Sequence, residues 1–271
     1  MMKLAALALL ATLASTASAL DWTADPVAQA RASVPALTPP PLFSAFSGTA
    51  GSFDSYVFSL EWTPAFCEGK SGLPECRALP GSFAATHLAL HGMWPDRNDD
   101  AAHKYGYCGV DAQTQALDRG PTWCRMPDVG ISAPVMSRLS TVMSGTQSCL
   151  QNHEWYKHGS CSGLTPDDYF TRASALVDAV AASSFGRFLT ANAGKTVSAA
   201  DLLAAFESDF GAGTRARVSL SCTSAPGGQA LLDVRVRLAN PLRPASELAA
   251  MLLPQPSAGN CPPSFLIDPV R

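Results

Sequence analysis

The sequence predicts a single α+β domain over residues 55–271, in which helices flank a central, mostly antiparallel sheet and disulfides staple the fold. Strand-like and helix-like segments are mixed, without the regular βαβ alternation of a parallel sheet. All eight cysteines lie after the N-terminal leader, and an even number in an exported chain indicates disulfides. A chain of this size can bury a core of its own.

Short alternating runs predict the strands in order. Tyr56, Phe58, Leu60 and Trp62 alternate as on one face of a strand, and residues 87–91 alternate in the same way. Gly92 and Pro95 are expected to end that second run, which would leave His91 at a strand end beside a loop. Two further β-rich runs, 217–222 and 231–238, flank a loop that contains Pro226-Gly227-Gly228.

Capping signals predict two helices. Thr165 followed by Pro166 and two acidic residues is typical of a helix start, so a helix should run to about Ser183. Ser198 with Asp201 three residues later predicts a second helix, which ends near Phe210.

Residues 1–19 have the pattern of a signal peptide. Lys3 precedes an apolar run, and Ala17-Ser18-Ala19 is typical of a cleavage site. No later segment offers a long uncharged apolar span, so we expect an exported protein, periplasmic or extracellular, without membrane contact after cleavage. Residues 20–54, rich in Pro, Ala and Ser, are interpreted as a tail or linker.

The densest cluster of ionisable residues is the segment from His153 to Cys161. At about 100° per residue, four ionisable groups share one side of a helix within an arc of about 140°, while Trp155 and Tyr156 point the other way and can anchor it. Groups this close perturb one another's pKa, which indicates acid–base chemistry. The four groups are His153, Glu154, Lys157 and His158.

Two alternatives to this interpretation are weaker. A zinc-binding helix needs two histidines four residues apart, whereas His153 and His158 are five apart and splay, so we predict no metal site. A solvated charged face is the ordinary interpretation of a mixed charge run, but this one is rich in aromatic residues and ends in Cys161. A lone histidine is more often a core residue than a catalyst, and His87 and His103 are interpreted so.

Two segments, Leu90-His91-Gly92-Met93-Trp94-Pro95 and His153–Gly159, resemble the signature blocks of the ribonuclease T2 family of secreted, base-unspecific ribonucleases. Met93 stands where the family usually has leucine, a change that preserves apolar volume. The likeness extends more weakly over residues 55 to about 268, and Tyr56–Trp62 is similar to the family's first strand.

The resemblance implies an endoribonuclease that cleaves single-stranded RNA by transphosphorylation through a 2′,3′-cyclic phosphate, without metal or cofactor. It implies His91 as general acid and His158 as general base, although exchanged roles would fit the sequence equally well. Glu154 would orient His158 or accept hydrogen bonds near the phosphate. Lys157 would stabilise the phosphorane, His153 would bind phosphate, and Trp94 is a candidate for base stacking or for plain core packing.

The resemblance also implies the disulfide pairing. It gives Cys67–Cys76, Cys108–Cys161 and Cys222–Cys261, and so leaves Cys124–Cys149. The second bridge would tie the loop after the first signature block to the end of the second block.

Composition limits how the protein meets RNA. The net charge is −3, and removal of Lys3 with the leader makes it −4, so attraction for a polyanion must be local. Arg215, Arg217, Arg235 and Arg237 are interpreted as the solvated face of a hairpin, with phosphate contact as the minority alternative. We expect RNA as the partner, no DNA and a monomer. A catalytically inactive binding protein and a zinc hydrolase are the rival functions, and both active-site histidines are present.

Overall fold

The computed structural model describes residues 48–100 and 105–271. The predicted signal peptide, the predicted tail up to residue 47, and His103 lie outside these residues. None of the described helices is both long enough and apolar enough to cross a membrane.

The strands form one sheet, as predicted. Its order is β2-β1-β5-β7-β3, with β4 and β6 also paired to β5, and every pairing is antiparallel except that of β5 with β7. The strands are β1 (Ser55–Glu61), β2 (Ala89–Asp96), β3 (Thr196–Ser198), β4 (Val218–Ala225), β5 (Gly228–Ala239), β6 (Leu252–Leu253) and β7 (Ser264–Leu266).

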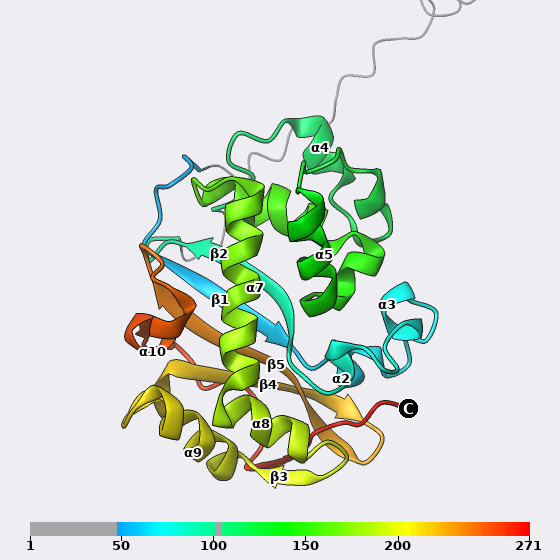
Figure 1. The fold of residues 1–271 in the computed structure, drawn as a ribbon, viewed down its shortest axis with the longest axis vertical. Coiled ribbons are helices and arrows are strands. Elements are labelled where there is room, and N and C mark those ends of the chain that lie inside the picture. The colour runs from blue at the N-terminus through cyan, green and yellow to red at the C-terminus, as the bar shows by residue number, and fades with distance from the viewer. Residues whose placement is uncertain (1–47, 101–104) are drawn as a thin grey trace, which may run out of the picture. The chain divides into compact units, whose positions relative to one another are not determined.

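Helices make up most of the remaining regular structure. Those labelled in Figure 1 are α2 (Thr63–Cys67), α3 (Pro74–Arg77), α4 (Ala112–Leu117), α5 (Ala133–Val142), α7 (Pro166–Ala182), α8 (Ser184–Ala191), α9 (Ala199–Phe210) and α10 (Leu248–Met251). The two predicted helices are α7 and α9. Thr165 caps α7 by accepting a hydrogen bond from the Asp168 N–H, and Ser198 caps α9 from its side chain.

The two faces of β1 differ in chemistry. Tyr56, Phe58 and Leu60 are buried in the main core, which also contains apolar residues of α7; this long helix crosses the sheet in Figure 1. The opposite face of the same strand carries Ser55, Val57, Ser59 and Glu61. Residues paired across neighbouring strands share a face. The polar face therefore also carries residues of β5 that pair with these, including Asp233, Arg235 and Arg237.

Four disulfides staple the described domain in the predicted pairing. They are Cys67–Cys76, Cys108–Cys161, Cys124–Cys149 and Cys222–Cys261.

Residues 48–54, assigned to the tail in the sequence analysis, pack against the domain. The Gly51 N–H donates to the Cys161 carbonyl at 2.8 Å, and the Tyr105 hydroxyl donates to the Thr49 carbonyl at 2.8 Å. The Phe53 ring lies 4.7 Å from that of Tyr56, edge to face. The folded domain therefore begins before residue 55.

Candidate active site

His91 is the extra residue of a β-bulge. Strand β2 does not end at Gly92 and Pro95, as the sequence indicated, but continues to Asp96. Leu90 pairs with Leu60 and Gly92 pairs with Ser59, so His91 has no partner on β1. A bulge of this kind redirects a side chain, and bulges are frequent beside active sites. Pro95 is tolerated because β2 is an edge strand.

The second signature segment is helical, as predicted, but its turns are not uniform. Helix α6 (Leu150–His153) passes into a π-helical turn at Glu154–His158 and a tight turn at Gly159–Cys161. π-Helical turns are rare in proteins overall, but those that occur are often found at functional sites. Trp155 packs inward on Tyr169, at 5.8 Å between ring centroids. The expectation that Tyr156 also anchors the helix in the core is wrong, because its exposed hydroxyl bonds backbone carbonyls of residues 127 and 128.

The two signature segments meet at Trp94. Its indole Nε1 donates to Glu154 Oε2 at 2.7 Å, and its ring centroid lies 5.3 Å from that of His91 and 5.2 Å from that of His158. A Cβ atom at Gly92 would collide with both the Glu154 carboxylate and the indole nitrogen, so glycine is required for this approach. The fold thus brings together the predicted residues His91, Trp94, Glu154 and His158.

The surroundings of the two histidines shift their pKa values in opposite directions. Burial lowers the pKa of His91, but Asp233, Glu154 and Glu61 outweigh it and raise that pKa above 6.5. Nδ1 of His91 lies 3.7 Å from Oδ1 of Asp233, an ion-pair distance longer than a hydrogen bond. Burial holds the pKa of His158 well below 6.5, helped by the positive charges of His153, Lys157 and His91. His91 therefore favours the charged form and His158 the neutral one.

Glu154 is fully buried. Burial raises the pKa of its carboxyl against the opposing effect of His153, His91 and the Trp94 hydrogen bond. Oε2 is bonded to Trp94, while Oε1 has no hydrogen-bond partner among the described residues and lies 3.9 Å from His153 Nε2. The hydrogen bond of Glu154 goes to Trp94, so Glu154 fixes the indole that lies between His91 and His158.

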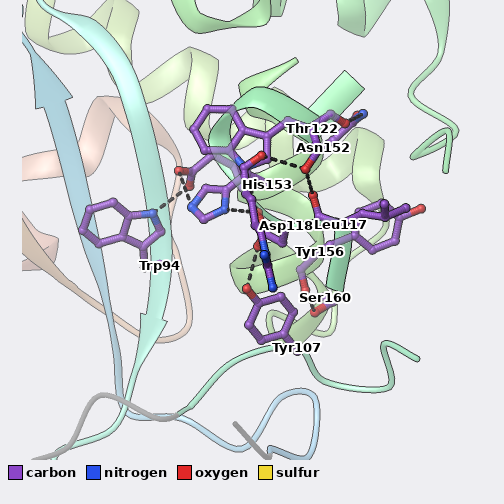
Figure 2. A network of polar contacts seen from close by, with 12 residues as sticks. Trp94, Tyr107, Leu117, Asp118, Thr122, Asn152, His153, Tyr156 and Ser160 are labelled. Carbon is purple, nitrogen blue, oxygen red and sulfur yellow. Dashed lines mark hydrogen bonds and ion pairs between the residues drawn. The ribbon is translucent and has the colours of Figure 1, made fainter. Parts of the chain in front are cut away.

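His153 belongs to a partly buried polar network, shown in Figure 2. Its Nδ1 lies 2.7 Å from Asp118 Oδ1, which also accepts from the Trp123 indole at 2.8 Å, while Oδ2 accepts from the Tyr107 hydroxyl at 2.6 Å. Burial alone would raise the pKa of Asp118, but these bonds lower it. No local pattern in the sequence marks Asp118, because its partner His153 lies in another segment.

A cavity of about 570 Å³ opens on the polar face of the sheet beside His158. Trp94, His158, Arg235 and Arg237 contribute to its lining. The Arg235 guanidinium lies 5.5 Å from the centre of the Trp94 ring, and Ser59 and Ser55 bond Arg235 and Arg237 respectively.

Arg235 and Arg237 lie on one face of the β4–β5 hairpin, and this partly exposed face lines the cavity. The other two members of the predicted set lie elsewhere: Arg215 pairs with Glu207, and Arg217 donates to the Leu252 carbonyl. Of the four, only Arg235 and Arg237 line the cavity next to His158.

One group of described residues has donor atoms close enough together for a metal ion. Atoms of Glu61, His91 and Asp233 lie within 4.8 Å of one another. Burial raises the pKa of Glu61 to about 7, so this carboxyl is protonated in acid and is then a poor ligand for a metal cation. The carboxylate of Asp233 already has a cation beside it, since Arg235 lies 3.5 Å away. We interpret the group as an ion-pair cluster around His91.

Comparisons with known proteins agree on one family. The sequence model of the Ribonuclease T2 family matches residues 53–246. Ribonuclease I of Escherichia coli (strain K12) is 33% identical over 239 residues, which cover 80% of this chain and 87% of that protein. A ribonuclease of Aeromonas hydrophila is 30% identical over 130 residues, covering 48% of this chain and 47% of that protein.

A solved structure shares the fold. Ribonuclease MC1 from the seeds of bitter gourd superimposes with a TM-score of 0.50 at 19% identity, covering 79% of this chain and 100% of that chain.

Proposed function

The chain belongs to the ribonuclease T2 family and is an endoribonuclease, and we propose that it cleaves single-stranded RNA by a metal-independent reaction between two histidines. In this proposal His91 is the general acid and His158 the general base. The assignment rests on one observation. His91 and His158 lie beside the same indole, that of Trp94, but their surroundings raise the pKa of His91 and lower the pKa of His158. It favours one of the two role assignments that the sequence left open.

The first step is an internal transfer. Neutral His158 removes the proton of the 2′-hydroxyl, and this oxygen attacks phosphorus. The bond from phosphorus to the 5′ oxygen breaks, and protonated His91 gives its proton to that oxygen. The products are a 2′,3′-cyclic phosphate and a free 5′-hydroxyl. Water then opens the cyclic phosphate with the two histidine roles reversed.

Neighbouring cations stabilise the charge that gathers on the phosphoryl oxygens. Lys157 and His153 are assigned to this task, because both contribute positive charge next to His158. The bond between His153 and Asp118 fixes the imidazole with Nδ1 occupied. Nε2 of His153 lies 3.9 Å from Glu154 Oε1, beyond hydrogen-bond distance, and is the nitrogen assigned to a phosphate oxygen.

The cavity on the polar face is proposed to receive the RNA strand. Trp94 lines it and is the side chain proposed to stack on a base, a contact that tolerates any sequence. Three arginines, Arg97, Arg235 and Arg237, outnumber the two aspartates in the lining and are proposed to supply the local attraction that the net charge of −3 does not. DNA lacks the 2′-hydroxyl that the first step requires, so it is not a substrate. We expect a monomer, exported to the periplasm or the medium.

The deciding experiment is a cleavage assay on RNA and DNA, each with and without EDTA. We expect RNA to be cut equally in both conditions, DNA to survive, and a 2′,3′-cyclic phosphate to be detectable among early products. The matched control is His158→Ala, purified in the same way, which excludes a contaminating ribonuclease. Inhibition by EDTA, or cutting of DNA, would contradict the proposal.

A further inference from the structure

Three carboxyl groups face His91, and they come from three different elements. Glu61 lies on β1, Asp233 on β5 and Glu154 on the π-helical turn, and all three act to raise the pKa of the imidazole. The positive charge of His91 in turn acts on the pKa of His158. Arg235 on β5 is a fixed cation that lies 3.5 Å from Asp233.

Asp233 is the carboxylate that His91 meets at closest range. Oδ1 of Asp233 and Nδ1 of His91 are 3.7 Å apart, both atoms are buried, and neither has a hydrogen-bond partner in the described chain. Glu61 lies directly across from Asp233 in the register of β1 and β5, but burial raises its pKa to about 7. Glu154 directs one oxygen to Trp94.

We propose that Asp233 is a positioning residue for the general acid. Its carboxylate holds Nδ1 of His91, so that Nε2 carries the proton that is delivered to the departing 5′ oxygen, and it stabilises the imidazolium before the proton leaves. A buried carboxylate on the far nitrogen of a catalytic imidazole has the same two effects in other enzymes. This inference rests on the proposed function, because it needs His91 to act as the acid.

Arg235 limits how Asp233 can act. Its guanidinium approaches Oδ2 and leaves Oδ1 directed to His91, so each carboxylate oxygen faces one cation. Loss of the carboxylate would therefore change two neighbours, the imidazole and an arginine of the RNA cavity. The experiment must separate these two effects.

The test compares Asp233→Asn with Arg235→Gln on two substrates. One is a dinucleotide, whose 5′ oxygen needs a proton to leave; the other is a nucleoside 3′-(4-nitrophenyl phosphate), whose nitrophenolate leaves without one. For Asp233→Asn we expect the alkaline limb of the pH profile of kcat/KM on the dinucleotide to move down by about one to three pH units, as for loss of an opposite charge at this range. The activated substrate should be cleaved at near the wild-type rate. Arg235→Gln should raise KM on the dinucleotide and leave the limb in place.

Other results would overturn the inference. An unmoved alkaline limb, or equal loss on both substrates, would mean that Asp233 serves the fold or substrate binding instead. The pKa of His91 in the free protein, followed by NMR, should fall in Asp233→Asn, and Asp233→Ser repeats the measurement if the first variant does not fold. His91→Ala keeps the two proposals apart. If it also spares the activated substrate while Asp233→Asn does not, only the inference fails; if it loses both substrates equally, His91 is not the acid and the proposed function fails.

Discussion

Trp94 donates a hydrogen bond of 2.7 Å from its indole nitrogen to the buried carboxylate of Glu154, across 60 residues of sequence. This bond joins an edge strand to a π-helical turn. Both histidine rings lie against the same indole, His91 at 5.3 Å and His158 at 5.2 Å between centroids. The relative placement of the proposed acid and base therefore depends in part on a contact between two side chains that carry no proton in the proposed reaction.

Gly92→Ala should disable the enzyme through this contact. The new methyl group would collide with both partners of the bond, and backbone at a bulge has little freedom to retreat. We expect kcat to fall by about tenfold or more, because a small displacement of catalytic groups is enough for such a loss. The far-UV circular dichroism spectrum should be retained. Gly120→Ala is the control, since nothing lies within 4 Å of a Cβ at that position. Equal activities of the two variants would contradict the role given to Gly92.

Removal of either imidazole should abolish most turnover. His91→Ala and His158→Ala are each expected to lower kcat/KM by about two to four orders of magnitude, the usual contribution of a general acid or base. Both side chains are only partly buried, so both variants should fold. The measurement is steady-state kinetics on RNA, with thermal melts to verify folding. Folded variants with near wild-type rates would remove both residues from the mechanism.

The pH dependence of kcat/KM should be bell-shaped around the ordinary histidine pKa of 6.5. His158 must be neutral, and its lowered pKa places the acid limb below that value. His91 must be protonated, and its raised pKa places the alkaline limb above it. Because the two groups interact, each limb is a property of the pair. A rate that climbs steadily through alkaline pH would instead indicate a lysine or a metal-bound hydroxide.

Much of this architecture follows from local signals in the sequence. The apolar alternation of β1, the caps of α7 and α9, and the meeting of the two signature segments were all predicted, because each depends on neighbours in the chain or on the family resemblance. The bulge at His91 was not predicted, since it exists only relative to the register of β1. Asp118 and Asp233 were missed for a similar reason. Each of these aspartates lies far along the chain from the histidine that it contacts, so only the folded structure reveals the pair.

The arginines of β5 should determine how strongly activity depends on salt. Arg235→Gln with Arg237→Gln should raise KM for RNA and flatten the plot of log kcat/KM against log salt concentration, by roughly 0.7 for each phosphate of a single strand that is no longer neutralised. Arg215→Gln is the matched control, because that side chain pairs with Glu207 and does not line the cavity. An unchanged slope in the double variant would exclude Arg235 and Arg237 as phosphate-binding residues.

Loss of the Cys108–Cys161 bridge should weaken both the fold and the site. The bridge closes a loop of 53 residues, worth about 4 kcal/mol if loop entropy alone acts. The double alanine variant should show that loss in a denaturant titration and should also have reduced kcat, since Cys161 follows His158 closely. The Cys67–Cys76 bridge closes a shorter span of 9 residues, and its replacement leaves both signature segments tied. That replacement should therefore cost less stability and little kcat; the reverse order would contradict this account.

The bulge has a consequence for how such a chain can change by deletion. Leu90 and Gly92 already oppose consecutive residues of β1, so excision of His91 would leave an uninterrupted ladder with no side chain moved to the other face of the sheet. A three-base deletion in the gene would thus remove the proposed general acid and the bulge in one event. The expected product is a folded variant without nuclease activity.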